Sequence, residues 1–132
     1  MSFDLESIRA GGMYTSLKGD TTEDKMKLLA AMGQADVKGE ELEKEPLSVA
    51  DVMLHPVTIT DEKTGASVDC VRTVLISPDG RTAAFVSDGI VSSLGNVIQV
   101  FGEPTWTKPL LMQVVQVNTR KGRRTYNLRV VG

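Results

Sequence analysis

Apolar and polar residues alternate along five segments of the C-terminal two thirds of the chain, which is the pattern of strands with one buried face. The predicted strands cover residues 49–60, 67–77, 82–86, 109–118 and 123–131. Pro56 marks an edge or a bulge in the first of them, because proline cannot donate to a strand ladder. The second is apolar on both faces, which suits a sheet that is covered on both sides.

The period of the pattern changes between the third and fourth strands. Apolar residues there recur at three- and four-residue spacing, so one stripe of a helix packs against the sheet. The stripe consists of Ile90, Val91, Leu94, Val97, Ile98 and Phe101. Ser87 or Asp88 can cap this helix, and Gly102 followed by Pro104 ends it. Three strands, a helix and two strands form the order of an OB-fold, a five-stranded barrel with minor helical content.

Residues 1–45 are organised differently, and we predict that they extend a binding domain of residues 46–132. Capping residues and first-turn acids predict a helix over Thr22–Met32. Its apolar stripe of Met26, Leu29 and Ala30 must dock on the barrel or on another copy of the protein. Residues 34–46 are mostly charged, and we interpret them as a solvated acidic linker. Their glutamates can also compete with nucleic acid for a basic groove.

Length and composition fit one core, since the chain has 132 residues of which 41% are hydrophobic. The sequence contains no stretch of about 20 apolar residues, so we expect no membrane-spanning helix. The N-terminus also lacks the basic segment followed by an apolar run that is typical of a leader. One cysteine, Cys70, and one histidine, His55, cannot assemble an ordinary zinc site. We expect a buried thiol, a structural histidine with one ring nitrogen bonded nearby, and no metal or cofactor. No catalytic spacing is present, so we expect no enzyme.

Charge is distributed unevenly behind a net value of -2. Residues 1–65 hold 7 Lys and Arg against 13 Asp and Glu, whereas residues 66–132 hold 8 against 4. After Glu103 there is no acidic side chain. This asymmetry creates a local positive field of the kind that attracts nucleic acid.

The candidate phosphate-binding residues come from this basic part of the chain. Four of them occupy the turn before the last strand: Arg120, Lys121, Arg123 and Arg124. The others are Arg72 and Arg81 on or beside the second and third strands, with Lys108 and Arg129. The alternative is that the cations only keep a barrel soluble, and Arg72 can equally pair with Asp69 or Asp51.

Aromatic side chains on which bases could stack are scarcer. Phe85 on the third strand is the best candidate, although strand aromatics are common in cores. Trp106 stands in a loop beside Lys108 and is either a stacking platform or a hydrophobic plug. We assign Phe101 and Tyr126 to the core, because each shares the apolar face of its element. Tyr14 is open to either role.

Several segments in order carry a family resemblance: Tyr14–Leu17, Asp20–Lys25, His55–Pro56, Thr73–Ile76 before Gly80, Val86–Ile90, Phe101–Trp106, Pro109–Leu110 and Thr119–Arg123. Together they resemble the single-stranded DNA-binding proteins of small tailed phages that infect Gram-positive bacteria, over nearly the whole chain. The resemblance implies an OB-fold protein that coats exposed strands during phage DNA replication, arranged like those of protein-primed replication. Since the sequence predicts neither a membrane span nor a leader, we also expect the protein to act in the host cytoplasm.

We therefore predict sequence-nonspecific binding of single-stranded DNA, with phage replication proteins as further possible partners and the oligomeric state open. The alternative is a phage barrel that binds a replication or host-defence protein through Trp106 and the N-terminal helix.

Overall fold

The computed structural model describes the backbone of residues 4–118 and 124–131, and the side chains there except those of residues 5, 9, 88 and 124. The five predicted strands are confirmed, each within a few residues of its predicted bounds. They are β4 (Asp51–Thr60), β5 (Ser67–Ile76), β6 (Thr82–Phe85), β7 (Leu110–Asn118) and β8 (Arg124–Val130). The predicted helix is α3 (Asp88–Phe101), which ends at Gly102 with φ 87°.

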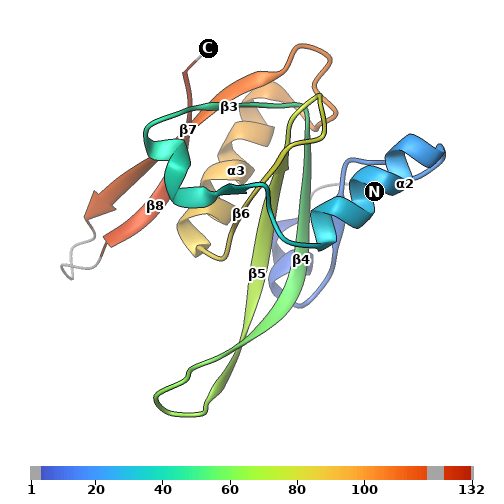
Figure 1. The fold of residues 1–132 in the computed structure, drawn as a ribbon. Helices are drawn as coiled ribbons and strands as arrows, with labels where there is room; N and C mark the ends of the chain where they lie inside the picture. The colour runs from blue at the N-terminus through green and yellow to red at the C-terminus, as the bar shows by residue number, and fades with distance from the viewer. Residues whose placement is uncertain (1–3, 119–123, 132) are drawn as a thin grey trace.

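Two sheets share one segment of chain that bends at Ala50 (Figure 1). Before the bend, β3 (Leu47–Val49) pairs with β7 in a sheet of order β3-β7-β8. After it, β4 pairs with β5 in a sheet of order β1-β4-β5-β6-β2. In the described residues β6 and β8 do not pair, so the two sheets do not close into the predicted five-stranded barrel.

The N-terminal residues add elements that the hydrophobic pattern does not predict. They are α1 (Leu5–Arg9), β1 (Tyr14–Thr15), β2 (Val37–Lys38) and the 3-10 helix η1 (Gly39–Glu43), beside the predicted α2 (Thr22–Met32). β2 pairs in parallel with β6, and Leu42 of η1 is only 1% exposed. The prediction of a solvated linker over residues 34–46 is therefore wrong.

The main core lies between the two sheets and α3 and includes N-terminal side chains. Its members come from most elements and include Ile8, Tyr14, Leu42, Leu75, Leu94 and Met112. A second cluster fills the other face of β4 and β5 with Leu17, Ala31, Met53, Val74 and Ile76. The prediction that β5 is covered on both faces is confirmed only for residues 73–76, where residues from α2 and its approach provide the second cover. It is wrong for residues 67–69, which are exposed.

Two groups of apolar residues that we predicted to be packed against the protein are exposed to solvent. In α2, Met26 is 67% and Leu29 74% exposed, because the helix docks through Ala31 and Leu28 instead of the predicted stripe. At the end of α3, Phe101 is 50% exposed, so its assignment to the core is also wrong. Phe101 instead lines a surface pocket together with Val130 at the end of β8.

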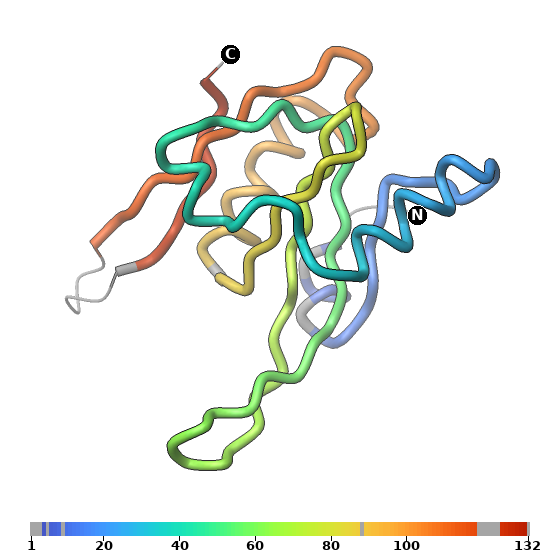
Figure 2. Tube along the Cα trace, viewed as in Figure 1, coloured from blue at the N-terminus to red at the C-terminus, as the bar shows by residue number. Residues whose placement is uncertain are grey.

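The distal half of the β4–β5 hairpin stands clear of the body as an arm (Figure 2). Beyond the paired residues His55 and Arg72, most positions of both strands are exposed or half-buried. Among the described helices, none is long and apolar enough to span a membrane.

Candidate nucleic-acid interface

A groove of about 700 Å³ opens where β6 and β8 fail to join. Its lining comes from β2 and η1, called the wall below, from the end of β6 and from the start of β8. Six of its lining residues carry the argument below: Lys38, Gly39, Glu40, Arg72, Phe85 and Tyr126. The groove therefore combines two aromatic rings with two cations and one carboxylate.

Phe85 ends β6, where it pairs with Thr73 of β5. Its ring is half-buried, packs in part against the main core and also lines the groove. An aromatic side chain in this position can keep one part fixed by apolar contacts while another part meets a ligand. Phe85 thus packs against the core and also reaches the groove, and its stacking on a base stays a prediction.

Tyr126 of β8 provides a second ring that the sequence did not identify. It is half-buried and packs against the core as predicted, but it also lines the groove beside Thr125. The alternation of β8 correctly places Tyr126 on the same face as Leu128. The signal that could have identified Tyr126 is its position near the start of β8. A core-facing residue at the end of a strand lies at the margin of the core and can also reach the surface.

Arg72 lies at the α2 end of the groove and binds backbone oxygens. Its Nη1 donates to the carbonyl oxygen of Ala31 at 2.7 Å, and its Nη2 donates to that of Gly33 at 2.7 Å. A cation at the C-terminal end of a helix also interacts favourably with the helix dipole. The alternative of pairing with Asp69 or Asp51 is wrong, because Arg72 fastens α2 to β5 instead.

His55 faces Arg72 across the β4–β5 ladder. Its Nε2 lies 3.1 Å from Nη1 of Arg72, and a guanidinium can only donate, so this ring nitrogen accepts. Burial, and then the charge of Arg72, lower the pKa of His55. The prediction of a structural histidine with one ring nitrogen bonded nearby is confirmed.

The wall formed by β2 and η1 is fastened to β6 by paired hydrogen bonds. The N–H of Asp36 donates to Oγ1 of Thr82 at 3.2 Å, and the N–H of Thr82 donates to Oδ2 of Asp36 at 3.0 Å. The parallel pairing of Val37 with Ala83 and of Lys38 with Ala84 continues this attachment. The wall thus belongs to the sheet rather than to a linker.

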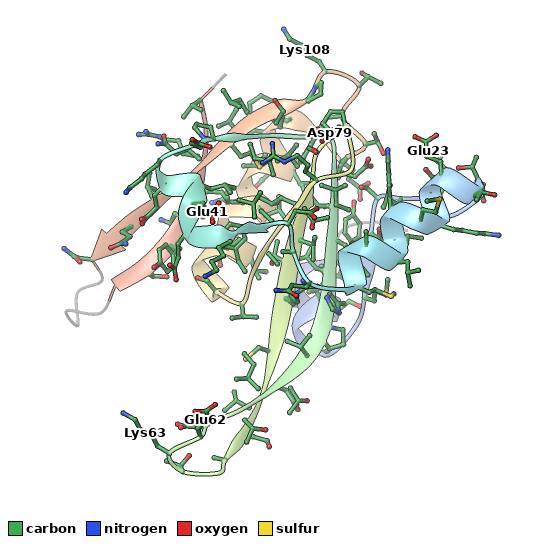
Figure 3. All side chains as sticks on the ribbon, viewed as in Figure 1. Glu23, Glu41, Glu62, Lys63, Asp79 and Lys108 are labelled. Carbon is green, nitrogen blue, oxygen red and sulfur yellow. The ribbon has the colours of Figure 1, made fainter. Side chains whose placement is uncertain are left out.

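Trp106 and Lys108 lie together, but away from the groove. Trp106 is 7% exposed, and its Nε1 donates to the carbonyl oxygen of Gly102 at 3.0 Å. This arrangement fits the hydrophobic plug rather than a stacking platform. The exposed Lys108 lies on the same loop, far from the η1 residue Glu41 (Figure 3).

The remaining predicted contacts are scattered or fall outside the described residues. Arg81 is exposed in the turn between β5 and β6, and the exposed Arg129 donates to Oε1 of Gln113 at 2.9 Å. Arg120, Lys121 and Arg123 lie outside the described residues. The side chain of Arg124 does too, although its backbone opens β8 directly before the groove residue Thr125.

Tyr14 is excluded as a stacking residue by its burial in the core. Its hydroxyl donates to Oε1 of Glu103 at 3.4 Å. Burial, and next the charge of Glu103, raise its pKa to about 12. In the described ranges no group of three or more His, Cys, Asp or Glu residues could hold a metal ion.

Comparison with protein families supplies what the geometry alone leaves open. Residues 10–131 match the Phi29-type family described as phage single-stranded DNA-binding protein. The chain belongs to this family. No curated protein and no solved structure matches it. As a phage single-stranded DNA-binding protein it binds single-stranded DNA in phage replication, and the alternative of a barrel devoted to a protein partner is not favoured.

Proposed function

We propose that single-stranded DNA lies in the groove between β6 and β8, with bases stacked on Phe85 and Tyr126. The observation that carries this proposal is the meeting of two half-buried rings with Lys38 and Arg72 in one opening. Binding of single strands without sequence preference requires flat apolar faces for bases and a cationic track for phosphates. The groove offers both kinds of group.

The cationic turn before β8 extends the track in this proposal. Arg120, Lys121, Arg123 and Arg124 precede Thr125, so chain connectivity leads from the turn into the groove lining. Arg81, Lys108 and Arg129 lie on other surfaces and would act only through the general positive field. Trp106 is left out of the track because it is buried.

We also infer that the architecture is an OB-fold opened between its third and fifth strands. Support comes from the segment shared by both sheets, β3 and β4, and from the helix between the third and fourth predicted strands. In such a fold the missing closure would create the binding groove. Stacking and phosphate contacts need no bond-making chemistry, so the proposed role is non-enzymatic coating of exposed strands in the host cytoplasm.

Phe85→Leu and Tyr126→Leu test the proposal because leucine keeps apolar volume but has no aromatic face. Each should weaken binding to fluorescent oligo-dT by about 1–3 kcal/mol. The free energy of unfolding, measured in urea, should change by less. Phe101→Leu is the matched control, since Phe101 is half-exposed outside this groove. If all three variants bind oligo-dT as tightly as the unaltered protein, the DNA binds outside this groove.

A further inference from the structure

Gly39 lies directly against the ring of Phe85. A Cβ built at position 39 would overlap Cδ1 and Cε1 of that ring and would lie 2.9 Å from the carbonyl oxygen of Ala84. The φ of Gly39 is outside the left-handed region, so backbone conformation does not require glycine here. Glycine is required because the ring occupies the space of a side chain.

The backbone around Gly39 is held on both sides, so it cannot easily retreat from the ring. Before it, Lys38 pairs with Ala84, and Asp36 exchanges hydrogen bonds with Thr82. After it, Leu42 is buried in the main core. A substituent at position 39 would therefore displace the half-buried ring, which is the less constrained partner.

We propose that Gly39 is a positioning residue for DNA binding, which sets the place and tilt of the Phe85 ring in the groove. This inference rests on the proposed function, because a fixed ring matters only if a base stacks on it. Gly39 contributes no group of its own to the DNA. The backbone of Gly39 supports one part of the ring and leaves the groove-facing part in a defined orientation. The N-terminal acidic segment thus shapes the aromatic site of the basic part.

A double-mutant cycle tests whether Gly39 acts through Phe85. Gly39→Ala should lower the affinity for oligo-dT by about fivefold or more, toward the loss expected for a disturbed stacking contact. In the Phe85→Leu background the same substitution should change affinity by less than about twofold, because no aromatic ring remains to be displaced. Circular dichroism and urea unfolding report whether each variant is folded.

Thr82→Val provides a second test that adds no bulk beside the ring and changes no charge. It removes the hydroxyl that accepts from Asp36, so the wall should loosen and affinity should fall, again only when Phe85 is present. This variant decides the matter if Gly39→Ala does not fold.

The outcomes separate this inference from the proposed function. If Phe85→Leu weakens binding while Gly39→Ala and Thr82→Val leave it unchanged, the positioning role is wrong and the stacking proposal stands. If Gly39→Ala weakens binding equally in both backgrounds, Gly39 does not act through Phe85. If Phe85→Leu itself has no effect, the positioning role and the stacking of a base on Phe85 both fail.

Discussion

The first 45 residues and the rest of the chain differ in charge and regularity, yet they share one core and one groove. The N-terminal part is acidic and consists of short elements, whereas the remainder is basic and contains the long strands. The N-terminal part nevertheless contributes Leu42 to the core and Lys38, Gly39 and Glu40 to the groove. A change in composition along a chain therefore need not mark a boundary between folding units.

Removing the N-terminal part should have the largest effect, because it tests whether the rest of the chain folds without it. The division at residues 45 and 46 stays a prediction, but burial argues against independent folding of residues 46–132. A variant that begins at Glu45 loses Ile8, Tyr14, Ala31 and Leu42 from the two clusters. Each large buried apolar side chain is worth about 2–5 kcal/mol, and whole domains have only about 5–15 kcal/mol of stability.

We therefore expect the variant that begins at Glu45 to show no cooperative urea transition and a poorly dispersed NMR spectrum. A variant that begins at Asp4 keeps all of these side chains and should unfold as the full chain does. A folded Glu45 variant with unchanged oligo-dT affinity would instead make the acidic part an accessory.

Neutralising the cationic turn tests the contribution of the basic part. Replacing Arg120, Lys121, Arg123 and Arg124 by glutamine should lower affinity at 0.1 M salt by about a hundredfold, since each phosphate contact contributes roughly 0.7 to the log–log salt slope. The slope itself should fall by about 3.

The control for the turn variant carries the same change in net charge elsewhere, with Lys18, Lys25, Lys27 and Lys63 replaced by glutamine. If both variants lose the same affinity and slope, net charge rather than a track at the turn controls binding.

Arg72 joins the two parts through its hydrogen bonds to Ala31 and Gly33. Its contact with His55 predicts a dependence of stability on pH. The pKa of His55 is lowered in the folded protein, so near pH 7 both folded and unfolded forms are neutral. As pH falls through about 6.5, the unfolded chain binds a proton first. The free energy of unfolding should decrease from that point down to the lower pKa of the folded state.

His55→Gln keeps an acceptor for Arg72 and does not titrate, which makes it the matched variant. Because His55 is the only histidine, urea unfolding of this variant should lose the pH dependence between pH 7 and 5. The same slope in both proteins would mean that His55 does not control stability in this range.

The carboxylates of η1 should produce the smallest effect and the opposite sign. Glu40 lines the groove, Glu41 is exposed beside it, and neither forms an ion pair in the described part of the chain. Replacing both by glutamine should raise oligo-dT affinity by about 1.5- to 5-fold at low salt, because exposed charge pairs are worth about 0.2–1 kcal/mol. The gain should shrink as salt screens the charges.

Glu62→Gln at the tip of the arm is the control for the η1 carboxylates, since it removes one negative charge far from η1 (Figure 3). A loss of affinity in the η1 variant would show that these carboxylates bind the DNA rather than repel it.

Most of the elements that the sequence predicted correctly are long ones. β5, β7, β8 and α3 each repeat their pattern over seven or more residues, so alternation or helical spacing identifies them. β2 has only two residues, and η1 contains one buried apolar residue among four charged or glycine positions. Such segments are ordered by tertiary contacts, which no local pattern encodes.

The groove could be predicted only in part, for the same reason. Phe85 and Arg72 were identified from strand position and residue type, but the gap between β6 and β8 depends on how the sheets meet. The roles that we propose for Tyr126 and Gly39 depend on that gap. The partners of Arg72 come from the end of α2, 39 and 41 residues earlier in the chain.

Photocrosslinking tests the central claim, the path of DNA through the groove, most directly. Oligo-dT carrying 5-iododeoxyuridine at single positions would be bound to the full chain, irradiated, and the adducts located by mass spectrometry. We predict adducts on Phe85 and Tyr126, lost for each ring in its leucine variant. Adducts confined to the arm, to Phe101 or to the loop around Trp106, with none on Phe85 or Tyr126, would contradict the account.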